Sequence, residues 1–209
     1  MLNIALPKGR LGEMVYDLLE KIGYECGGFR EENRKLVLEN KEKGIRYLLV
    51  KPSDVGIYVE KGAADIGFVG KDILLENNHD IYELLDLKFG KCKIAVAAPV
   101  SYKEDNERKL RVATKYVNIA KNYYSSLNRE VEIIKLNGSI ELAPILNLSD
   151  VIVDIVETGN TLRENNLKVI EDIEEISARF IVNKVSLKFK NEIIEKIIGK
   201  VREAIWLEQ

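Results

Sequence analysis

The feature that most constrains the fold of this chain is a repeated pattern: a short apolar run is followed by a turn that contains glycine and then by apolar residues at helical spacing. Residues 2–6 form an apolar run, and apolar side chains then recur at helical spacing over residues 11–22. The order returns at residues 64–69, where Gly70 separates an apolar run from a helical pattern that starts near Asp72. Short apolar runs bounded by turns indicate strands, and a 3.6-residue period indicates helices. The alternation predicts an α/β architecture with mostly parallel sheets.

The second half of the chain continues this order. Residues 111–114 predict a strand that leads into a helix over residues 117–127, and residues 151–156 predict a strand that ends in a Thr-Gly-Asn-Thr turn. The segments AADIGFVGKDIL and LSDVIVDIVETGNTL both run from an aspartate through an apolar strand and a glycine turn into a helix. This echo suggests two similar lobes that offer strand-to-helix turns to a shared cleft, where open α/β sheets bind ligands.

The sequence contains no Gly/Ser-rich or Pro-rich linker, so continuous strands or short turns are expected to join the lobes. We predict crossings at residues 88–91 and 174–179. The first lobe then comprises residues 1–88 plus 175–209, and the second comprises residues 89–174. The C-terminal stretch has the apolar stripe of an amphipathic helix and is expected to pack back on the first lobe.

Charge, hydropathy and cysteine usage exclude several classes of function. The 32 basic and 34 acidic side chains leave a net charge of -2, so we expect no nucleic-acid or anionic-lipid partner, and any phosphate site must be local. No apolar stretch approaches the ~20 residues of a membrane span, which together with the short apolar start predicts a cytoplasmic protein. Cys26 and Cys92 lie far apart, so neither a disulfide nor a zinc site is expected. We expect Cys92 to be a structural thiol and His79, in a polar turn, to be solvated.

Residues 151–162 carry the most chemical information. Strand alternation places Ile152, Asp154 and Val156 on one face, so Asp154 is a carboxylate among apolar neighbours near the end of its strand. Residues 158–161 then supply hydroxyls, flexible backbone N–H groups and a helix start, which are features that hold phosphate. A phosphorylated ribose fits, with the acid on the sugar hydroxyls and the loop on the 5′-phosphate. The open alternative is a threonine-capped helix beside a core aspartate bonded to backbone.

The stretch ELAPILNLSDVIVDIVETGNTL, residues 141–162, resembles the signature of the ATP phosphoribosyltransferases. The resemblance extends over essentially the whole chain, through LPKGRL, Asn33-Arg34-Lys35-Leu36, GAADIGFVGKDIL, FGKCKIAVAAP, RVATKY and NGSIELAP. The chain resembles the catalytic subunit of the short form, because it ends at Gln209 without room for the C-terminal regulatory domain of the long form.

The resemblance implies a fold and a reaction. The fold is α/β and two-lobed, of the type II periplasmic-binding-protein kind, with a central cleft. The reaction opens histidine biosynthesis: N1 of the adenine of ATP attacks C1 of phosphoribosyl pyrophosphate, inverts that carbon and releases pyrophosphate. The resemblance also implies Mg²⁺ that is held mostly by substrate oxygens and water, with no metal-ligating residue of the chain.

The resemblance assigns roles to individual residues. It implies that Asp154 contacts the ribose hydroxyls and that the 5′-phosphate is cradled by Thr158, Gly159, Asn160 and Thr161. Together with Asp154, the cations Lys8, Arg34 and Lys51 are the implied catalytic residues, and Arg10 is a further contact to the phosphates of ATP and pyrophosphate.

Three other polar residues near these motifs each have two possible roles. Glu157 can contact ribose or metal, but a carboxylate near a phosphate is repelled unless a cation intervenes, so a solvent-facing role is preferred. Ser139 and Glu141 line the cleft near a nucleotide, or they cap a helix.

Two positions depart from the family pattern. Lys51 stands where the family commonly has arginine, so it keeps the charge but loses the bidentate fork. Asn147 stands where glycine is usual, which affects a turn and no group assigned to chemistry.

The resemblance further implies a regulatory subunit that resembles histidyl-tRNA synthetase, and a homodimer within a hetero-oligomer. Two rival functions share parts of the pattern. A solute-binding or effector-sensing module could use the two-lobed fold without chemistry. A purine or pyrimidine salvage phosphoribosyltransferase would also need a ribose-binding acid and a phosphate loop.

Overall fold

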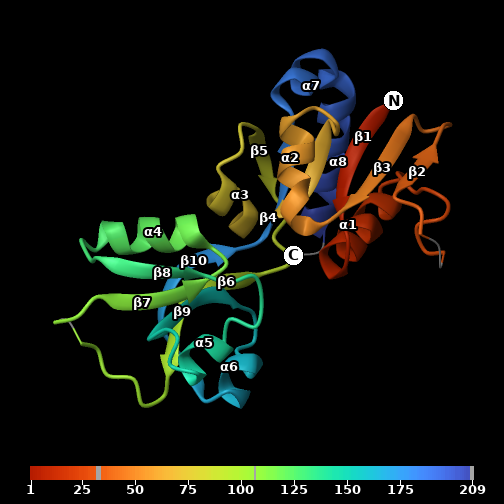
Figure 1. The fold of residues 1–209 in the computed structure, drawn as a ribbon. Coiled ribbons are helices and arrows are strands. Elements are labelled where there is room, and N and C mark those ends of the chain that lie inside the picture. The colour runs from red at the N-terminus through yellow and green to blue at the C-terminus, as the bar shows by residue number, and fades with distance from the viewer. Residues whose placement is uncertain (32–33, 106, 208–209) are drawn as a thin grey trace. The chain divides into compact units, whose positions relative to one another are not determined.

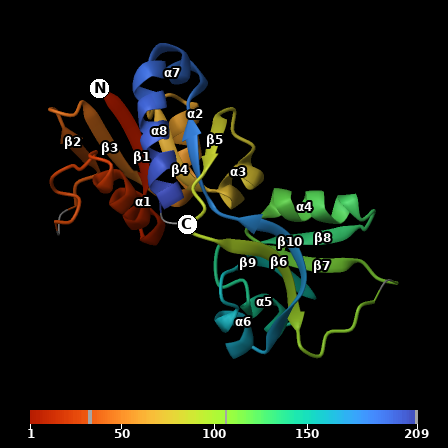
Figure 2. The same ribbon diagram turned by 180° about the vertical axis from the view of Figure 1, so that it is seen from behind.

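The computed structural model describes residues 1–31, 34–105 and 107–207, which divide into two units (Figures 1 and 2). Unit 1 takes the described residues within 1–74, 78–90 and 177–207, and unit 2 takes those within 75–77 and 91–176. The chain therefore passes from unit 1 to unit 2 after Gly90 and returns after Ile176.

A six-stranded sheet forms the centre of unit 1, in the order β2-β3-β1-β4-β11-β5. Its strands are β1 (Leu2–Pro7), β2 (Val37–Asn40), β3 (Ile45–Val50), β4 (Ile66–Gly70), β5 (Tyr82–Asp86) and β11 (Ala178–Val182). The helical segments that follow or flank them are α1 (Arg10–Lys21), the 3-10 turn η1 (Pro52–Asp54), α2 (Val55–Glu60), α3 (Lys71–Asn77), α7 (Lys184–Phe189) and α8 (Asn191–Leu207).

Alternation along β1 separates the two faces of this sheet. Leu2, Ile4 and Leu6 are buried in the core that α1 and α8 cover, whereas Ala5 packs into the cluster under α2. Helix α1 lies close against β1 because its third residue is Gly12, where a Cβ would come within 1.7 Å of the carbonyl oxygen of Pro7. The buried isoleucines of α8 belong to the same core, which confirms the expected packing of the C-terminal helix on this part of the chain.

A five-stranded sheet forms the centre of unit 2, in the order β10-β6-β9-β7-β8. Its strands are β6 (Cys92–Pro99), β7 (Leu110–Thr114), β8 (Val131–Lys135), β9 (Val151–Val156) and β10 (Leu167–Ile176). Helix α4 (Val117–Ser126) covers one face, and the short helices α5 (Leu142–Ile145) and α6 (Asn160–Glu164) lie on the other (Figure 1).

The expected α/β architecture is confirmed, but the expectation of mostly parallel sheets is wrong. β1 pairs in parallel with β3 and β4, and β7 does so with β8 and β9. The strands next to the chain crossings run the other way: β6 is antiparallel to β9 and β10, and β11 is antiparallel to β4 and β5. Both β6 and β11 are interior strands, each second from one edge of its sheet, so each contributes two antiparallel pairings.

The expectation of a solvated His79 is also wrong. Only 10% of its side chain is exposed, and it packs on α2, where a Cβ at Gly56 would lie 2.2 Å from His79 Cδ2. Cys92 is half-buried against the core under α4, as expected for a structural thiol. Among the described helices, none combines the length and apolar character that a membrane crossing requires.

Candidate functional site

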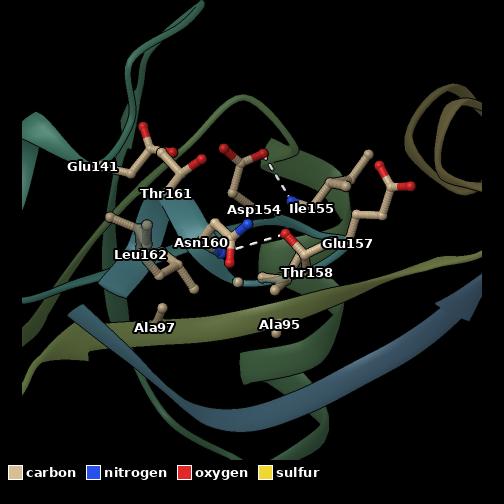
Figure 3. Close-up of a pocket in the computed structure, with 13 residues that line it drawn as sticks. Ala95, Ala97, Glu141, Asp154, Ile155, Glu157, Thr158, Asn160, Thr161 and Leu162 are labelled. Carbon is tan, nitrogen blue, oxygen red and sulfur yellow. Dashed lines mark hydrogen bonds between the residues drawn. The ribbon is translucent and has the colours of Figure 1, made fainter. Parts of the chain in front are cut away.

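A pocket of about 240 Å³ opens in unit 2 at the carboxyl end of β9 (Figure 3). Its lining comes from β6, β9, the segment before α5, and the loop and helix that follow β9. The lining residues are Ala95, Ala97, Glu141, Ile152, Asp154, Ile155, Val156, Glu157, Thr158, Gly159, Asn160, Thr161 and Leu162. The strand acid and the whole predicted phosphate loop therefore face one opening.

The alternation of β9 delivers Asp154 to this pocket. Ile152 and Val156 are buried in the core under α5 and α6, whereas Val151 and Val153 belong to the core under α4. Asp154 thus points to the α5 and α6 side, as the sequence predicts. Its side chain is 18% exposed, and its Oδ1 accepts a 2.8 Å hydrogen bond from the backbone N–H of Ile155. The core-aspartate alternative is correct about a backbone bond, but the same carboxylate also lines the pocket.

Burial raises the pKa of Asp154 above its ordinary value, and the nearby carboxylate of Glu141 adds to the rise. The ammonium of Lys115 and the N–H of Ile155 act in the opposite direction without cancelling the effect of burial. The distance from Lys115 Nζ to Asp154 Oδ1 is 3.6 Å. The carboxylate is therefore held in a poorly solvated place with one cation beside it, where a hydroxyl donor from a ligand would stabilise its ionised form.

The loop after β9 turns sharply at Gly159, which has φ 72° and stands at the N-cap of α6. The N-cap residue of α6 is glycine, so no threonine occupies the N-cap position that the alternative requires. Thr158 Oγ1 instead accepts a long bond of 3.4 Å from the backbone N–H of Asn160. The turn leaves Thr158, Asn160 and Thr161 exposed at the pocket, so hydroxyl and amide groups remain accessible to a ligand.

The two glutamates of the pocket lie on opposite sides of Asp154 (Figure 3). In Figure 3 the oxygens of Glu141, Thr161 and Asp154 point the same way, whereas the carboxylate of Glu157 lies on the opposite side of Asp154 from Glu141. Glu157 is exposed, in agreement with the preferred reading of a solvent-facing side chain. Glu141 stands at the N-cap of α5 without a side-chain cap bond, so its helix-capping reading is wrong.

Ser139 does not line this pocket. It is exposed and adopts φ 48°, and its backbone carbonyl accepts a 3.1 Å bond from the N–H of Leu142. Its contribution in the structure is thus a backbone turn that leads into α5.

The other predicted residues belong to unit 1 and do not line the pocket. Lys8 and Lys51 follow β1 and β3, whose parallel register pairs Pro7 with Val50, and the N–H of Lys8 donates to the carbonyl of Val50 at 2.8 Å. Two exposed cations therefore stand side by side at the carboxyl edge of one sheet. Arg10 opens α1, and Arg34 is exposed in the segment before β2. Asn33 of the same motif lies outside the described residues.

Two cations near the pocket were missed by sequence reasoning. Lys115 follows β7, whose register pairs Thr114 with Val153, so the next residues on the two strands are Lys115 and Asp154. Arg163 of α6 donates from Nη1 to the carbonyl of Thr158 at 3.2 Å and from Nη2 to Oδ1 of Asn160. The available signal for Lys115 was its place directly after the predicted strand over residues 111–114.

The family model of HisG, the ATP phosphoribosyltransferase, matches residues 51–203. The chain belongs to the ATP phosphoribosyltransferase family. A relative of that name from Brachyspira hyodysenteriae (strain ATCC 49526 / WA1) is 74% identical over 206 residues, which are 98% of this chain and 100% of the relative. Another from Caldanaerobacter subterraneus subsp. tengcongensis is 54% identical, with 98% of each chain covered.

Solved structures agree with membership of the ATP phosphoribosyltransferase family. The ATP phosphoribosyl transferase (HisG:HisZ) complex from Thermotoga maritima matches with a TM-score of 0.87 and 39% identity, over 98% of each chain. The periplasmic aliphatic sulphonate binding protein SsuA from Escherichia coli matches with a TM-score of 0.63 and 12% identity, over 99% of this chain and 68% of that chain. The second likeness concerns the fold alone, and it confirms a two-lobed fold of the periplasmic-binding-protein kind.

Proposed function

We propose that this chain transfers the 5-phosphoribosyl group of phosphoribosyl pyrophosphate to N1 of the adenine of ATP, giving N1-(5-phosphoribosyl)-ATP and pyrophosphate, the first step of histidine biosynthesis. The observation that carries the proposal is that Asp154 and residues 158–161 line one pocket. A sugar-binding carboxylate and a hydroxyl-lined loop can therefore reach the same phosphorylated ribose. Membership of the family supplies the donor and the acceptor.

In this proposal the pocket holds the ribose 5-phosphate part of the donor. The carboxylate of Asp154 accepts hydrogen bonds from the ribose hydroxyls, which offsets its poor solvation. The hydroxyls of Thr158 and Thr161 and the backbone N–H groups of Gly159 and Asn160 donate to the phosphate oxygens. Fixing the sugar in this way leaves C1 in a defined position for attack, which is the positional part of catalysis.

The negative charge of the pocket lining supports the placement of the ribose ring in this pocket. Three carboxylates, those of Glu141, Asp154 and Glu157, line the pocket, and its thirteen described lining residues include no lysine or arginine. Positive character that develops on the ribose ring during transfer is stabilised by such a lining. We assign Lys8, Arg10, Arg34 and Lys51 of unit 1, as a set of cations, to the phosphates of ATP and pyrophosphate, where negative charge gathers.

Magnesium fits this site when it is carried by the substrate. Among the described residues no group of three or more histidine, cysteine, aspartate or glutamate side chains could hold a metal ion. Mg²⁺ binds few protein ligands and keeps water and phosphate oxygens, so a pocket with separate carboxylates suits substrate-bound Mg²⁺. When bound, it would neutralise charge on the leaving pyrophosphate.

The assembly and location of the protein are further parts of the proposal. The Thermotoga maritima relative is a HisG:HisZ complex, and it aligns with almost the whole of this chain. We therefore assign to this chain a regulatory partner that resembles histidyl-tRNA synthetase, a homodimer within a hetero-oligomer, and a cytoplasmic location.

The test is incubation of the chain with ATP, phosphoribosyl pyrophosphate and Mg²⁺, with and without the candidate partner, while the absorbance of the N1-substituted adenine and the release of pyrophosphate are followed. We expect product with ATP and none with free adenine, guanine or uracil. Release with a free base would favour a salvage enzyme, and absence of release with the partner present would favour a binding module. Full activity and full histidine inhibition of the isolated chain would contradict the assigned partner.

A further inference from the structure

Arg163 is not among the residues that line the pocket, yet it contacts two of them. Its guanidinium donates from Nη1 to the carbonyl oxygen of Thr158 at 3.2 Å and from Nη2 to Oδ1 of Asn160. Gly159 lies between these acceptors, and a Cβ built on Gly159 would lie 3.4 Å from Arg163 Nη1. One planar group therefore spans the loop from the residue before Gly159 to the residue after it.

The contact with Arg163 decides which end of the Asn160 amide is offered to a ligand. Arginine has donors and no acceptor, so the amide must turn its oxygen to the guanidinium. The NH₂ group of Asn160 then remains as a donor on a side chain that lines the pocket. Phosphate oxygens accept hydrogen bonds, so the orientation imposed by Arg163 matches a phosphate and would oppose a cation.

The second contact acts on the backbone of the loop. A carbonyl oxygen carries partial negative charge and would repel a phosphate that came near it. The carbonyl oxygen of Thr158 is engaged by Arg163, and Gly159 holds the left-handed turn that follows it with φ 72°. The loop is thereby held with one acceptor tied to a cation, while the neighbouring N–H of Asn160 makes only the long 3.4 Å bond to Thr158 Oγ1, which an anion can replace.

We propose that Arg163 is a positioning residue: it holds the 5′-phosphate loop in place and orients the amide of Asn160 so that its NH₂ group can donate a hydrogen bond to the phosphate. The inference rests on the proposed function, because it deepens the role of the same pocket. Arg163 acts through Thr158 and Asn160, so its contribution is to the binding of phosphoribosyl pyrophosphate. It requires the two-pronged geometry of a guanidinium, which lysine lacks.

The experiment compares Arg163→Met, Arg163→Lys, Asn160→Ala and the combined Arg163→Met, Asn160→Ala variant. The readouts are steady-state kinetics of the full chain with its partner and calorimetric binding of phosphoribosyl pyrophosphate. Both Arg163 variants are expected to raise the KM for phosphoribosyl pyrophosphate by about 10-fold, with kcat and the KM for ATP within about 2-fold. In the Asn160→Ala background, Arg163→Met should have a clearly smaller effect, because the residue it orients is gone.

Lys168→Met is the matched control, since it removes one exposed cation from neighbouring β10 and should leave the KM values unchanged. Hydrogen exchange at the amides of Gly159 and Asn160 should be faster in Arg163→Met than in the control. A wild-type KM in Arg163→Lys, or fully additive effects in the combined variant, would overturn the inference alone. Failure of the unaltered chain to bind phosphoribosyl pyrophosphate would overturn it together with the proposed function.

Discussion

The ammonium nitrogen of Lys115 lies 3.6 Å from Oδ1 of Asp154. Lys115 directly follows β7, and Asp154 lies within the neighbouring parallel strand β9. The side chain of Lys115 is 42% exposed and its nitrogen also lies 4.8 Å from the ring centroid of Tyr116. The lysine end of the pair is therefore open to water, which screens its attraction to the poorly solvated carboxylate. The importance of the pair lies in the charge state of Asp154, whose pKa burial raises and Lys115 lowers.

Replacing Lys115 should change the pH dependence of the reaction. In Lys115→Gln the cation that favours the ionised carboxylate is lost, so the pKa of Asp154 rises further and the acidic limb of kcat/KM moves to higher pH. The titration of the substrate phosphates affects the variant and the wild type equally, so it cancels in the ratio of their kcat/KM values. Lys121→Gln, an exposed change on α4, should give a ratio that is flat with pH. A flat ratio for Lys115→Gln would contradict the pairing with Asp154.

Removing the charge of Asp154 should separate activity from stability. Asp154→Asn is expected to lower kcat/KM by at least ~10-fold, about 1.4 kcal/mol of transition-state stabilisation, because a ribose contact is lost. The chain should nevertheless fold, and its free energy of unfolding at pH 7 should not fall. An unchanged rate would remove the ribose role from Asp154.

The sign of that stability effect follows from the raised pKa. A carboxyl group with a higher pKa in the folded state destabilises the protein as the pH rises from its unfolded value through the folded value. Urea unfolding of wild type and Asp154→Asn across this range should show a difference that grows in favour of the variant as the pH rises. A difference that grows the other way would show that Asp154 is stabilised by folding.

Local patterns predicted the site better than they predicted its surroundings. The side-chain alternation of β9 and the polar turn after it are properties of a few consecutive residues, so the pocket position of Asp154 could be read from the sequence. Lys115 is placed by the pairing of β7 with β9, which no single segment encodes. The bond from Arg163 to the carbonyl oxygen of Thr158 depends on the left-handed turn at Gly159, which separates Thr158 from α6.

The difference between local and long-range determinants also accounts for the errors in the predicted fold. The direction of β6, β10 and β11 depends on how the chain crosses between the units, and their apolar patterns carry no sign of direction. His79 lies in a polar turn, but its burial depends on α2, about twenty residues earlier in the chain. Expectations drawn from local composition fail where a distant element decides exposure.

The departure at Asn147 has a structural account that can be tested. Asn147 adopts φ 56°, and its backbone carbonyl and side-chain Oδ1 accept bonds from Arg111 at 2.9 and 3.1 Å. Asparagine tolerates the left-handed region better than other side chains, so it can replace glycine there. Asn147→Gly should be nearly neutral, whereas Asn147→Ala should lower the free energy of unfolding by about 1 kcal/mol in urea titrations. Equal losses in the two variants would assign the effect to the Arg111 contact instead of the backbone.

Asp150 directly precedes β9 and anchors the start of this strand through its bonds to two arginines; its side chain is only 5% exposed. Burial alone would raise its pKa, but hydrogen bonds from Arg111 and Arg108, at 2.9 and 2.8 Å, outweigh burial and hold the pKa well below its usual range. Asp150→Asn should therefore lower the free energy of unfolding at pH 7. We expect about 2 kcal/mol, less than for a fully buried pair, because both arginine side chains are partly exposed.

The pH dependence of this loss has the opposite sign to that of Asp154. A depressed pKa stabilises the fold above the unfolded value, and this contribution disappears as the pH falls through the folded value. The difference between wild type and Asp150→Asn, measured by urea unfolding, should therefore be full at pH 7 and shrink on acidification below about pH 4. Asp172→Asn is the matched control, since this aspartate is 56% exposed in a surface pair with Lys93 and should change stability by less than about 0.5 kcal/mol. A loss in Asp150→Asn that stayed constant with pH would mean that shape, and not the charge of Asp150, holds the start of β9.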